Sequence, residues 1–316
     1  MNDNAFGLNM QAPLVAFLSS HTPLQHLYLN NNGLGPHAGI LIADALSNLH
    51  AKKEAARKEG KNVPDLETVI CGRNRLENGS MNAWARMYSL HSGVKEVKMV
   101  QNGIRQEGIS HLLSEGLKHT KSIKILDLQD NTFTILGSRA LAGVISGWTE
   151  IVELGVGDSL LGAKGGVLVA NALAKGSNKN LEILRLQFND LTSTSLEAFV
   201  KATQSSLPAL RKVEITGNKF SEENAHLETL KDLLEARKEE TAGDVVVEDD
   251  WGLDSLSDLE GSDSDEDEEE EEEEEQEHVR EKLIQDAEEA QEEPVIGRKD
   301  PEVDDLAKEL EKKVHI

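Results

Sequence analysis

The chemically distinctive residues of this sequence are polar side chains that form hydrogen bonds, rather than nucleophiles or metal ligands. The stretch LYLNNNGLG, Leu27 to Gly35, places three consecutive asparagines at the start of a glycine-containing turn. An asparagine amide offers an acceptor oxygen and two donor hydrogens, so it can orient another group without reacting itself. The ten histidines are scattered without metal-ligand spacing, and GxSxG, P-loop and HExxH motifs are absent from the sequence. We therefore expect a binding surface with no metal site.

The asparagines belong to a repeat of 28 to 30 residues. In each copy two apolar residues alternate in a short strand, and an anchor residue follows three positions after the second. The anchors fall at positions 4, 32, 74, 102, 131, 159, 189 and 218, and the single step of 42 residues is one unit with an insertion. This period predicts an α/β leucine-rich repeat solenoid of the ribonuclease-inhibitor type, with a helix after each strand. Apolar pairs four residues apart predict the buried helix faces: Ile42/Leu46, Leu141/Ile145 and Val169/Leu173.

The anchor asparagines are expected to be structural. The chain turns inside such a solenoid, where backbone groups meet no water, and a buried amide can satisfy the turns of its own and the neighbouring coil. This predicted ladder comprises Asn32, Asn74, Asn102, Asn131, Asn189 and Asn218. The anchor at position 159 is serine, which we expect to be a weaker link. Cys71, the single cysteine, occupies an apolar strand position, so we interpret it as a packing residue.

The net charge of −25 belongs to one end of the chain. Residues 243–316 hold 32 of the 58 acidic residues and 7 of the 33 basic ones, so residues 1–242 are neutral. We predict a solenoid over residues 1–242 and an acidic, mostly disordered tail over residues 243–316. Eleven consecutive acids at 265–275 favour either a solubilising tail or a contact with a basic partner. Serines at 255, 257, 262 and 264 precede acids, which is a weak signal for phosphorylation.

The two ends of the solenoid differ in sequence. Residues 221–240 predict a charged amphipathic helix that caps the C-terminal end. Met1 falls on the second apolar strand position of the first unit, so we expect further repeats to precede the part present here. A single cysteine, no signal peptide and no apolar window of membrane-spanning length favour the cytoplasm, with the nuclear periphery as a second location.

Four stretches together go beyond a generic leucine-rich repeat: HTPLQHLYLNNNGLGPHAG, ICGRNRLENGSM, VKMVQNGIRQEGISHLL and LDLQDNTFT. They closely resemble the Ran GTPase-activating proteins, whose fungal form is similar in having such repeats followed by an acidic tail. The resemblance implies an activator that is not itself an enzyme, binds the small GTPase Ran in its GTP state and supports nucleocytoplasmic transport. GTP and magnesium would belong to the partner, so no cofactor is expected. We expect a monomer that binds neither nucleic acid nor membrane, with a Ran-binding protein or another basic partner for the tail.

The resemblance also implies the roles of particular residues. Members of this family use no arginine finger and instead orient the catalytic machinery of Ran, a role that the resemblance assigns to Asn31. The expected partner-binding residues are Asn30, Arg73, Arg75, Gln101, Arg105, Gln129 and Asp130, which follow adjacent strands and predict one polar edge. The family has a further important arginine in an earlier repeat, which no residue here matches. Arg73 looks similar to that arginine but belongs to a different repeat, so we do not assign its role to Arg73.

Two alternatives remain open from the sequence. One is a leucine-rich repeat scaffold or inhibitor whose acidic tail chaperones basic proteins. The other is a truncated relative that binds Ran without activating it. Considered without the resemblance, Asn31 is better interpreted as an ordinary solvated turn residue.

Overall fold

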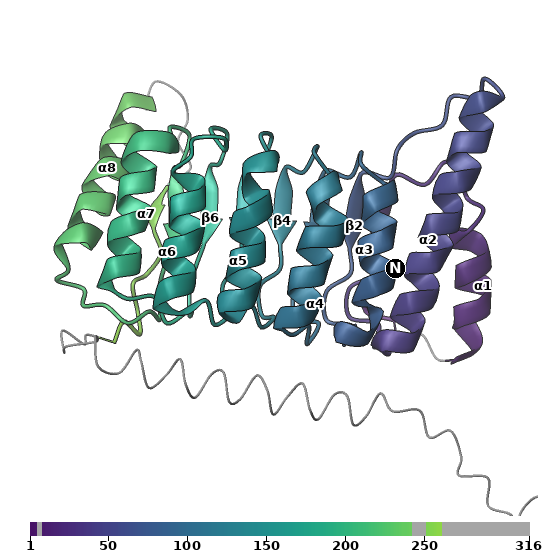
Figure 1. Ribbon diagram of the computed structural model, residues 1–316, viewed down its shortest axis with the longest axis horizontal. Helices are drawn as coiled ribbons and strands as arrows, with labels where there is room; N and C mark the ends of the chain where they lie inside the picture. Colours follow the sequence, from purple (N-terminus) through teal and green to yellow (C-terminus); the bar gives the residue numbers. More distant parts are fainter. Residues whose placement is uncertain (5–7, 242–250, 261–316) are drawn as a thin grey trace, which may run out of the picture. The chain divides into compact units, whose positions relative to one another are not determined.

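Each repeat contributes one short strand and one helix in the computed structural model, which describes residues 1–4, 8–241 and 251–260. The strands lie in chain order in one parallel sheet. They are β1 (His26–Tyr28), β2 (Thr68–Ile70), β3 (Glu96–Lys98), β4 (Ile125–Asp127), β5 (Glu153–Gly155), β6 (Ile183–Arg185), β7 (Lys212–Glu214) and β8 (Gly252–Leu253). The helices form a row against one face of this sheet (Figure 1). The predicted α/β leucine-rich repeat fold is therefore confirmed.

The helices vary in length and regularity. They are α1 (Leu8–Leu18), α2 (Gly35–Lys58), α3 (Met81–Leu90), α4 (Gln106–His111), α5 (Thr134–Val144), α6 (Gly162–Leu173), α7 (Ser193–Ser206) and α8 (Ala225–Thr241). A short 3₁₀ turn at Asn78–Ser80 precedes α3, and α4 continues through a π-helical turn at Leu112–Gly116. The parallel register of the strands continues across the repeats that contain these irregular turns.

The core lies between the sheet and the helices. The central residue of each three-residue strand points toward the helices, and equivalent residues pair from coil to coil, as in Leu27 with Val69 and Val69 with Val97. These side chains are buried, as are the helix pairs predicted from their spacing. Cys71 is also fully buried, and burial raises the pKa of its thiol to about 12, which confirms that it is a packing residue.

The predicted asparagine ladder is present. Asn102 is fully buried, and its Nδ2 donates to the carbonyl oxygens of Cys71 and Met99 at 2.8 and 3.0 Å. Its Oδ1 accepts the backbone N–H of Asn74 at 2.9 Å. The same pattern recurs at Asn32, Asn74, Asn131, Asn189 and Asn218. Ser159 instead donates its hydroxyl to Gly157 O within its own coil, so it joins fewer coils than an asparagine does.

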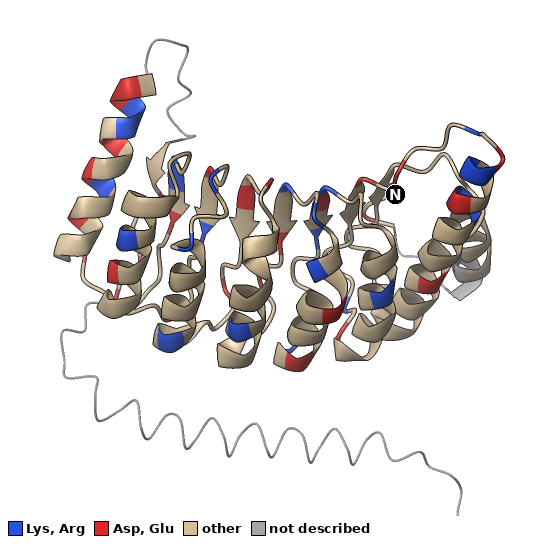
Figure 2. Cartoon of the chain, turned by 45° about the horizontal axis from the view of Figure 1, so that its top comes forward, with Lys and Arg blue, Asp and Glu red and all other residues tan. Residues whose placement is uncertain are grey.

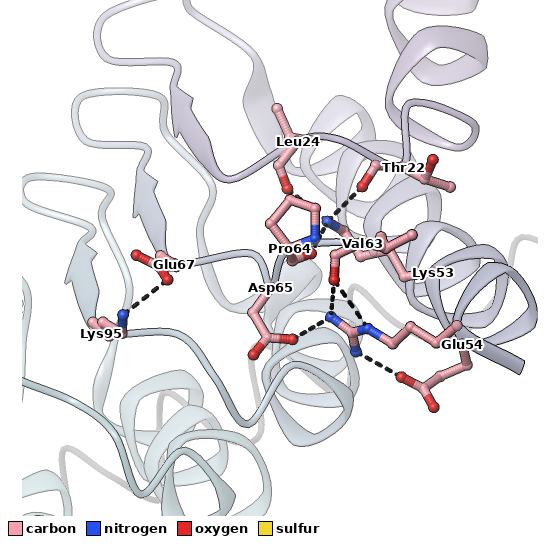
Figure 3. Close-up of polar contacts among 10 residues, drawn as sticks. Thr22, Leu24, Lys53, Glu54, Val63, Pro64, Asp65, Glu67 and Lys95 are labelled. Atoms are coloured by element: carbon pink, nitrogen blue, oxygen red, sulfur yellow. Dashed lines mark hydrogen bonds and ion pairs between the residues drawn. The ribbon is translucent and has the colours of Figure 1, made fainter. Parts of the chain in front are cut away.

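The inserted residues of the long repeat extend α2 and the loop that follows it, and a buried lysine ties them down. Lys53 is 1% exposed, and its Nζ donates to the carbonyl oxygens of Thr22, Leu24 and Pro64 at 2.6–2.8 Å (Figure 3). Burial lowers the pKa of Lys53 to about 8, so the ammonium form predominates at neutral pH. Arg57 holds the same loop through Val63 O and the Asp65 carboxylate.

The C-terminal end of the solenoid is covered as predicted by α8, which buries Leu227, Leu230 and Leu234. Arg237 donates to the carbonyl oxygens of Thr203 and Leu210 at 2.8 and 2.7 Å, which fixes α8 to the preceding repeat. Figure 2 shows that α8 carries charges of both signs, as expected for a helix with one face in solvent.

The predicted boundary after residue 242 is too early. Strand β8 pairs in parallel with β7, so the compact unit that holds the solenoid includes residues 251–260. Leu253, Leu256 and Leu259 pack against the core. Their spacing does not follow the repeat frame, and they lie among acidic residues, which is why composition assigned them to the tail. The acidic run at 265–275 and the serines at 262 and 264 lie outside the described residues.

Two absences apply to the described residues. None of their helices has both the length and the apolar content needed to cross a membrane. Within the same residues, no three His, Cys, Asp or Glu side chains are grouped in a way that would hold a metal ion.

We expect Asn102→Ala to lower the free energy of unfolding by about 3 kcal/mol, because buried backbone groups of three residues lose their partners. Urea titration followed by circular dichroism measures this. Asn82→Ala, at an exposed position of α3, is the matched control and should change stability by less than about 0.5 kcal/mol. Equal effects of the two substitutions would contradict a structural ladder.

Lys53→Met should also destabilise the fold at pH 7, by about 3 kcal/mol, because it leaves three carbonyl oxygens without their donor. Thermal unfolding compares it with Lys52→Met, which changes the exposed neighbouring residue. A Lys53→Met protein as stable as Lys52→Met would show that the insertion does not depend on this ammonium group.

Candidate functional site

The residue before each anchor adopts a left-handed backbone conformation. The angle φ is +54° at Asn31, +56° at Arg73, +54° at Gln101 and +57° at Asp130. The members of this strand-end row are Asp3, Asn31, Arg73, Gln101, Asp130, Asp158 and Phe188, with Gly217 at the last position. A non-glycine residue costs about 1 kcal/mol or more in this conformation, although asparagine and aspartate tolerate it better than others. At each position of the row the fold therefore fixes the backbone conformation, whereas the type of side chain varies.

Hydrogen bonds between coils impose this conformation. The backbone N–H of Asn31 donates to Gly72 O at 2.9 Å, that of Arg73 to Val100 O at 2.8 Å, and that of Gln101 to Gln129 O at 3.0 Å. Because the strands are parallel, the row runs along one edge of the sheet, where strands lead into helices. The predicted polar edge is thus formed by a fixed main chain.

The three asparagines of the opening stretch have different environments. Asn32 is 2% exposed and belongs to the ladder. Asn30 is half-buried, and its Oδ1 accepts the backbone N–H of Gly72 at 2.6 Å, so its acceptor is used within the fold. Asn31 is exposed, and its Nδ2 donates to Asp3 Oδ1 at 3.0 Å. Of the two residues predicted to face a partner, Asn31 is the one whose side chain is presented at the surface.

The arginines predicted to bind a partner lie on the same edge. Arg73 is exposed, and its Nε donates to Gln101 Oε1 at 2.8 Å. Arg75, exposed with φ +53°, follows Arg73 in the same loop. Arg105 is exposed beyond the next strand, and Asn78 Oδ1 accepts its backbone N–H at 2.8 Å. These residues place three guanidinium groups on the N-terminal part of the edge, together with the carboxylate of Asp3.

Gln129 is not part of this edge. Its side chain lies over the sheet, where Nε2 donates to Asp127 Oδ1 at 2.9 Å and Oε1 accepts from Gln187 Nε2 at 2.5 Å. The bond between Gln129 and Gln187 passes over Gly157, which lies in the coil between them. A Cβ at position 157 would lie only 2.4 Å from Gln187 Cδ. The geometry places Gln129 in a polar network on the sheet face instead of beside Asp130.

The C-terminal part of the edge is acidic. Burial and the neighbouring Asp158 carboxylate raise the pKa of Asp130, while Arg73 opposes this rise. Asp190 continues the acidic side one coil further on and forms an ion pair with Lys219 at 3.6 Å. A partner with both charge signs on its surface would complement this edge in only one orientation.

Several residues of the edge were not predicted from the sequence. Asp3 and Asp158 occupy the position of Asn31 in other coils, and the regular frame alone could have located them. Leu160 and Phe188 are 52% and 46% exposed, each with φ +53°. Both residues lie only a few positions after a predicted strand. From the sequence pattern, an apolar residue at such a position is expected to be buried.

Repeat, ladder and polar edge together define a leucine-rich repeat protein, and a family described as "Leucine Rich repeat" matches residues 177–200. The chain is 41% identical over 235 residues to Ran GTPase-activating protein 1 of Saccharomyces cerevisiae. The aligned region covers 73% of this chain and 56% of the yeast protein. It is 32% identical over 227 residues to Ran GTPase-activating protein of Drosophila melanogaster, covering 71% of this chain and 37% of that protein. It is also 42% identical over 106 residues to Ran GTPase-activating protein 1 of Xenopus laevis, covering 33% of this chain and 18% of that protein.

The solenoid of this chain is thus similar in sequence to Ran GTPase-activating proteins of yeast, fly and frog. The matched part spans about half the length of the yeast relative and less of the animal ones. The stretch that holds the three asparagines and the polar edge lies in the solenoid, the part of the chain that the structure describes.

We expect Asp158→Asn to lower the pKa of Asp130, because it removes the neighbouring negative charge that raises it. Titration of the side-chain carboxyl carbon of Asp130 by NMR measures the change. Asp190→Asn, which removes a charge from a more distant coil, is the control and should leave the titration nearly unchanged. A pKa that responds equally to both substitutions would contradict a direct interaction between Asp130 and Asp158.

Proposed function

We propose that this chain is a GTPase activator of Ran that acts in trans and has no active site of its own. It binds Ran in its GTP state along the strand-end row, and GTP and magnesium belong to Ran. The observation that carries the proposal is Asn31: an exposed amide on a fixed backbone, in a chain 41% identical to a yeast protein named for this activity. The protein acts as a monomer in the cytoplasm, including the nuclear periphery, where it supports nucleocytoplasmic transport.

The proposed mechanism is orientation. Asn31 is flanked by Asn30, which is bonded to Gly72, and by Asn32, which is locked into the ladder. Its own N–H is bonded to Gly72 O, so the Cα–Cβ direction is set before a partner arrives. A group held in this way can fix the catalytic residues or the attacking water of Ran without losing much further conformational entropy, and such positioning lowers a barrier substantially.

The arginines have a different proposed role. Arg73, Arg75 and Arg105 give the edge a positive field that attracts the acidic surface of a partner and accelerates encounter at low ionic strength. Asp130 and Asp158 contact a basic surface of the partner that lies next to this acidic one. The Arg73 guanidinium is held by Gln101 Oε1, which suits a residue that docks the partner and needs no insertion into its nucleotide site. For the tail, we propose a contact between the acids at 265–275 and a basic partner such as a Ran-binding protein.

Single-turnover hydrolysis of GTP by Ran, with and without the chain, tests the proposal. The unmodified chain should accelerate hydrolysis, and Asn31→Ala should reduce the acceleration about 100-fold, because an orienting contact is lost. Asn82→Ala, an asparagine exposed on α3, should retain the full rate. A correctly folded chain that gives no acceleration would overturn the proposal, and full activity of Asn31→Ala would overturn the role of Asn31.

A further inference from the structure

The exposed amide of Asn31 has a partner in the preceding coil. Its Nδ2 donates to Asp3 Oδ1 at 3.0 Å, although the two residues lie 28 positions apart in the sequence. Asp3 occupies the same frame position as Asn31, has the same left-handed backbone with φ +57°, and donates its own N–H to Asn30 O at 2.9 Å. The strand-end row therefore begins at Asp3, and its first two side chains are bonded to each other.

The coil that carries Asp3 is joined to the solenoid on both sides of this residue. Asn4 N–H donates to Asn32 Oδ1 at 2.9 Å, and Asn32 Nδ2 donates to Met1 O at 3.0 Å. Asn2 Oδ1 accepts the backbone N–H of Asn30 at 2.9 Å. The carboxylate of Asp3 is thus attached to a main chain that the ladder fixes relative to Asn31.

The chemistry of a carboxylate determines which end of the amide it faces. An ionised aspartate only accepts hydrogen bonds, so the NH₂ group of Asn31 must point toward Asp3. The terminal torsion of asparagine is broad, and an exposed amide without such a neighbour samples both orientations. With Asp3 in place, Oδ1 of Asn31 points away from the preceding coil and is left as an acceptor.

We propose that Asp3 is a positioning residue for Asn31: it holds the amide with its carbonyl oxygen toward the partner. The group that meets Asn31 on the partner is then an N–H or O–H donor. This inference rests on the proposed function, because it assigns the orientation of the residue that carries that function. A similar pairing along the row joins Arg73 to Gln101 at 2.8 Å.

The kinetic test compares saturating rates with half-saturating concentrations in single-turnover hydrolysis of GTP by Ran. Asp3→Ala should lower the saturating rate about tenfold, since the orientation of the amide is lost, and should change the half-saturating concentration less than about twofold. Asp3→Asn keeps an acceptor oxygen at this position and should restore most of the rate. Asp44→Ala, which removes an exposed carboxylate bonded to Arg86 in the helical layer, is the matched control and should be fully active.

A double substitution decides whether Asp3 acts through Asn31. Asp3→Ala should have no further effect in an Asn31→Ala background. A tenfold loss that persists in that background, or a fully active Asp3→Ala protein, would overturn the inference while leaving the proposed function intact.

The orientation can also be measured on the free protein. The ¹⁵N heteronuclear NOE of the Asn31 side-chain amide should fall in Asp3→Ala and remain near its original value in Asp3→Asn and Asp44→Ala. If the unmodified chain does not activate Ran, the proposed function fails and this comparison alone decides whether Asp3 orients the amide. An NOE that Asp3→Ala leaves unchanged overturns the inference whatever the activity.

Discussion

The hydrogen bonds of the buried asparagines are the interaction on which the rest of this structure depends. A solenoid coil reverses direction inside the molecule, where its peptide groups would otherwise lose water without gaining a partner. Each ladder amide supplies donors to carbonyl groups of two coils and an acceptor to the backbone of the preceding one. Because the acceptor and both donors are used, the amide fixes the separation and rotation of neighbouring coils. The parallel register of three-residue strands, too short to be stable alone, follows from this.

The polar edge results from the same turn. To bring each anchor amide inside, the preceding residue takes a left-handed conformation and turns its side chain outward. A row of outward side chains at regular spacing is then available in every repeat at a modest cost in backbone energy. The protein uses this row for amide, guanidinium, carboxylate and apolar groups in succession, so one structural requirement generates a surface of varied chemistry. The function proposed for Asn31 is possible because its neighbour Asn32 performs the structural task.

Much of this could be predicted from the sequence, and the failures have identifiable causes. The period of the anchors predicted the fold class, the ladder and the buried faces of the helices, because a buried position restricts residue type strongly. The edge residues Asn31, Arg73, Gln101 and Asp130 followed from their places beside the anchors. Gln129 was expected beside Asp130, but it precedes the left-handed residue of the turn, and its side chain lies over the sheet, where it is bonded to Asp127 and Gln187.

Other features depend on contacts that no local pattern encodes. The role of Lys53 could not be predicted, because it depends on three carbonyl groups from two separate loops that converge on its buried ammonium group. The frame could have located Asp3, but its bond to Asn31 joins residues 28 positions apart and is shown only by the folded structure. Strand β8 was missed because its leucines do not repeat the frame and the surrounding composition is acidic.

The position of β8 affects how the acidic segment can be separated from the folded part. The acidic residues begin before the last strand of the sheet, so this strand lies within the region that composition alone would remove. Cleavage ahead of Trp251 would take away charge and at the same time expose the N–H and C=O groups along the free side of β7, together with the apolar surface beneath Leu253. Such an open strand can pair with another chain. A shortened protein of this kind would therefore differ from the intact one in its tendency to self-associate. A comparison of the two would measure the effect of uncovering β7 as well as the effect of removing negative charge.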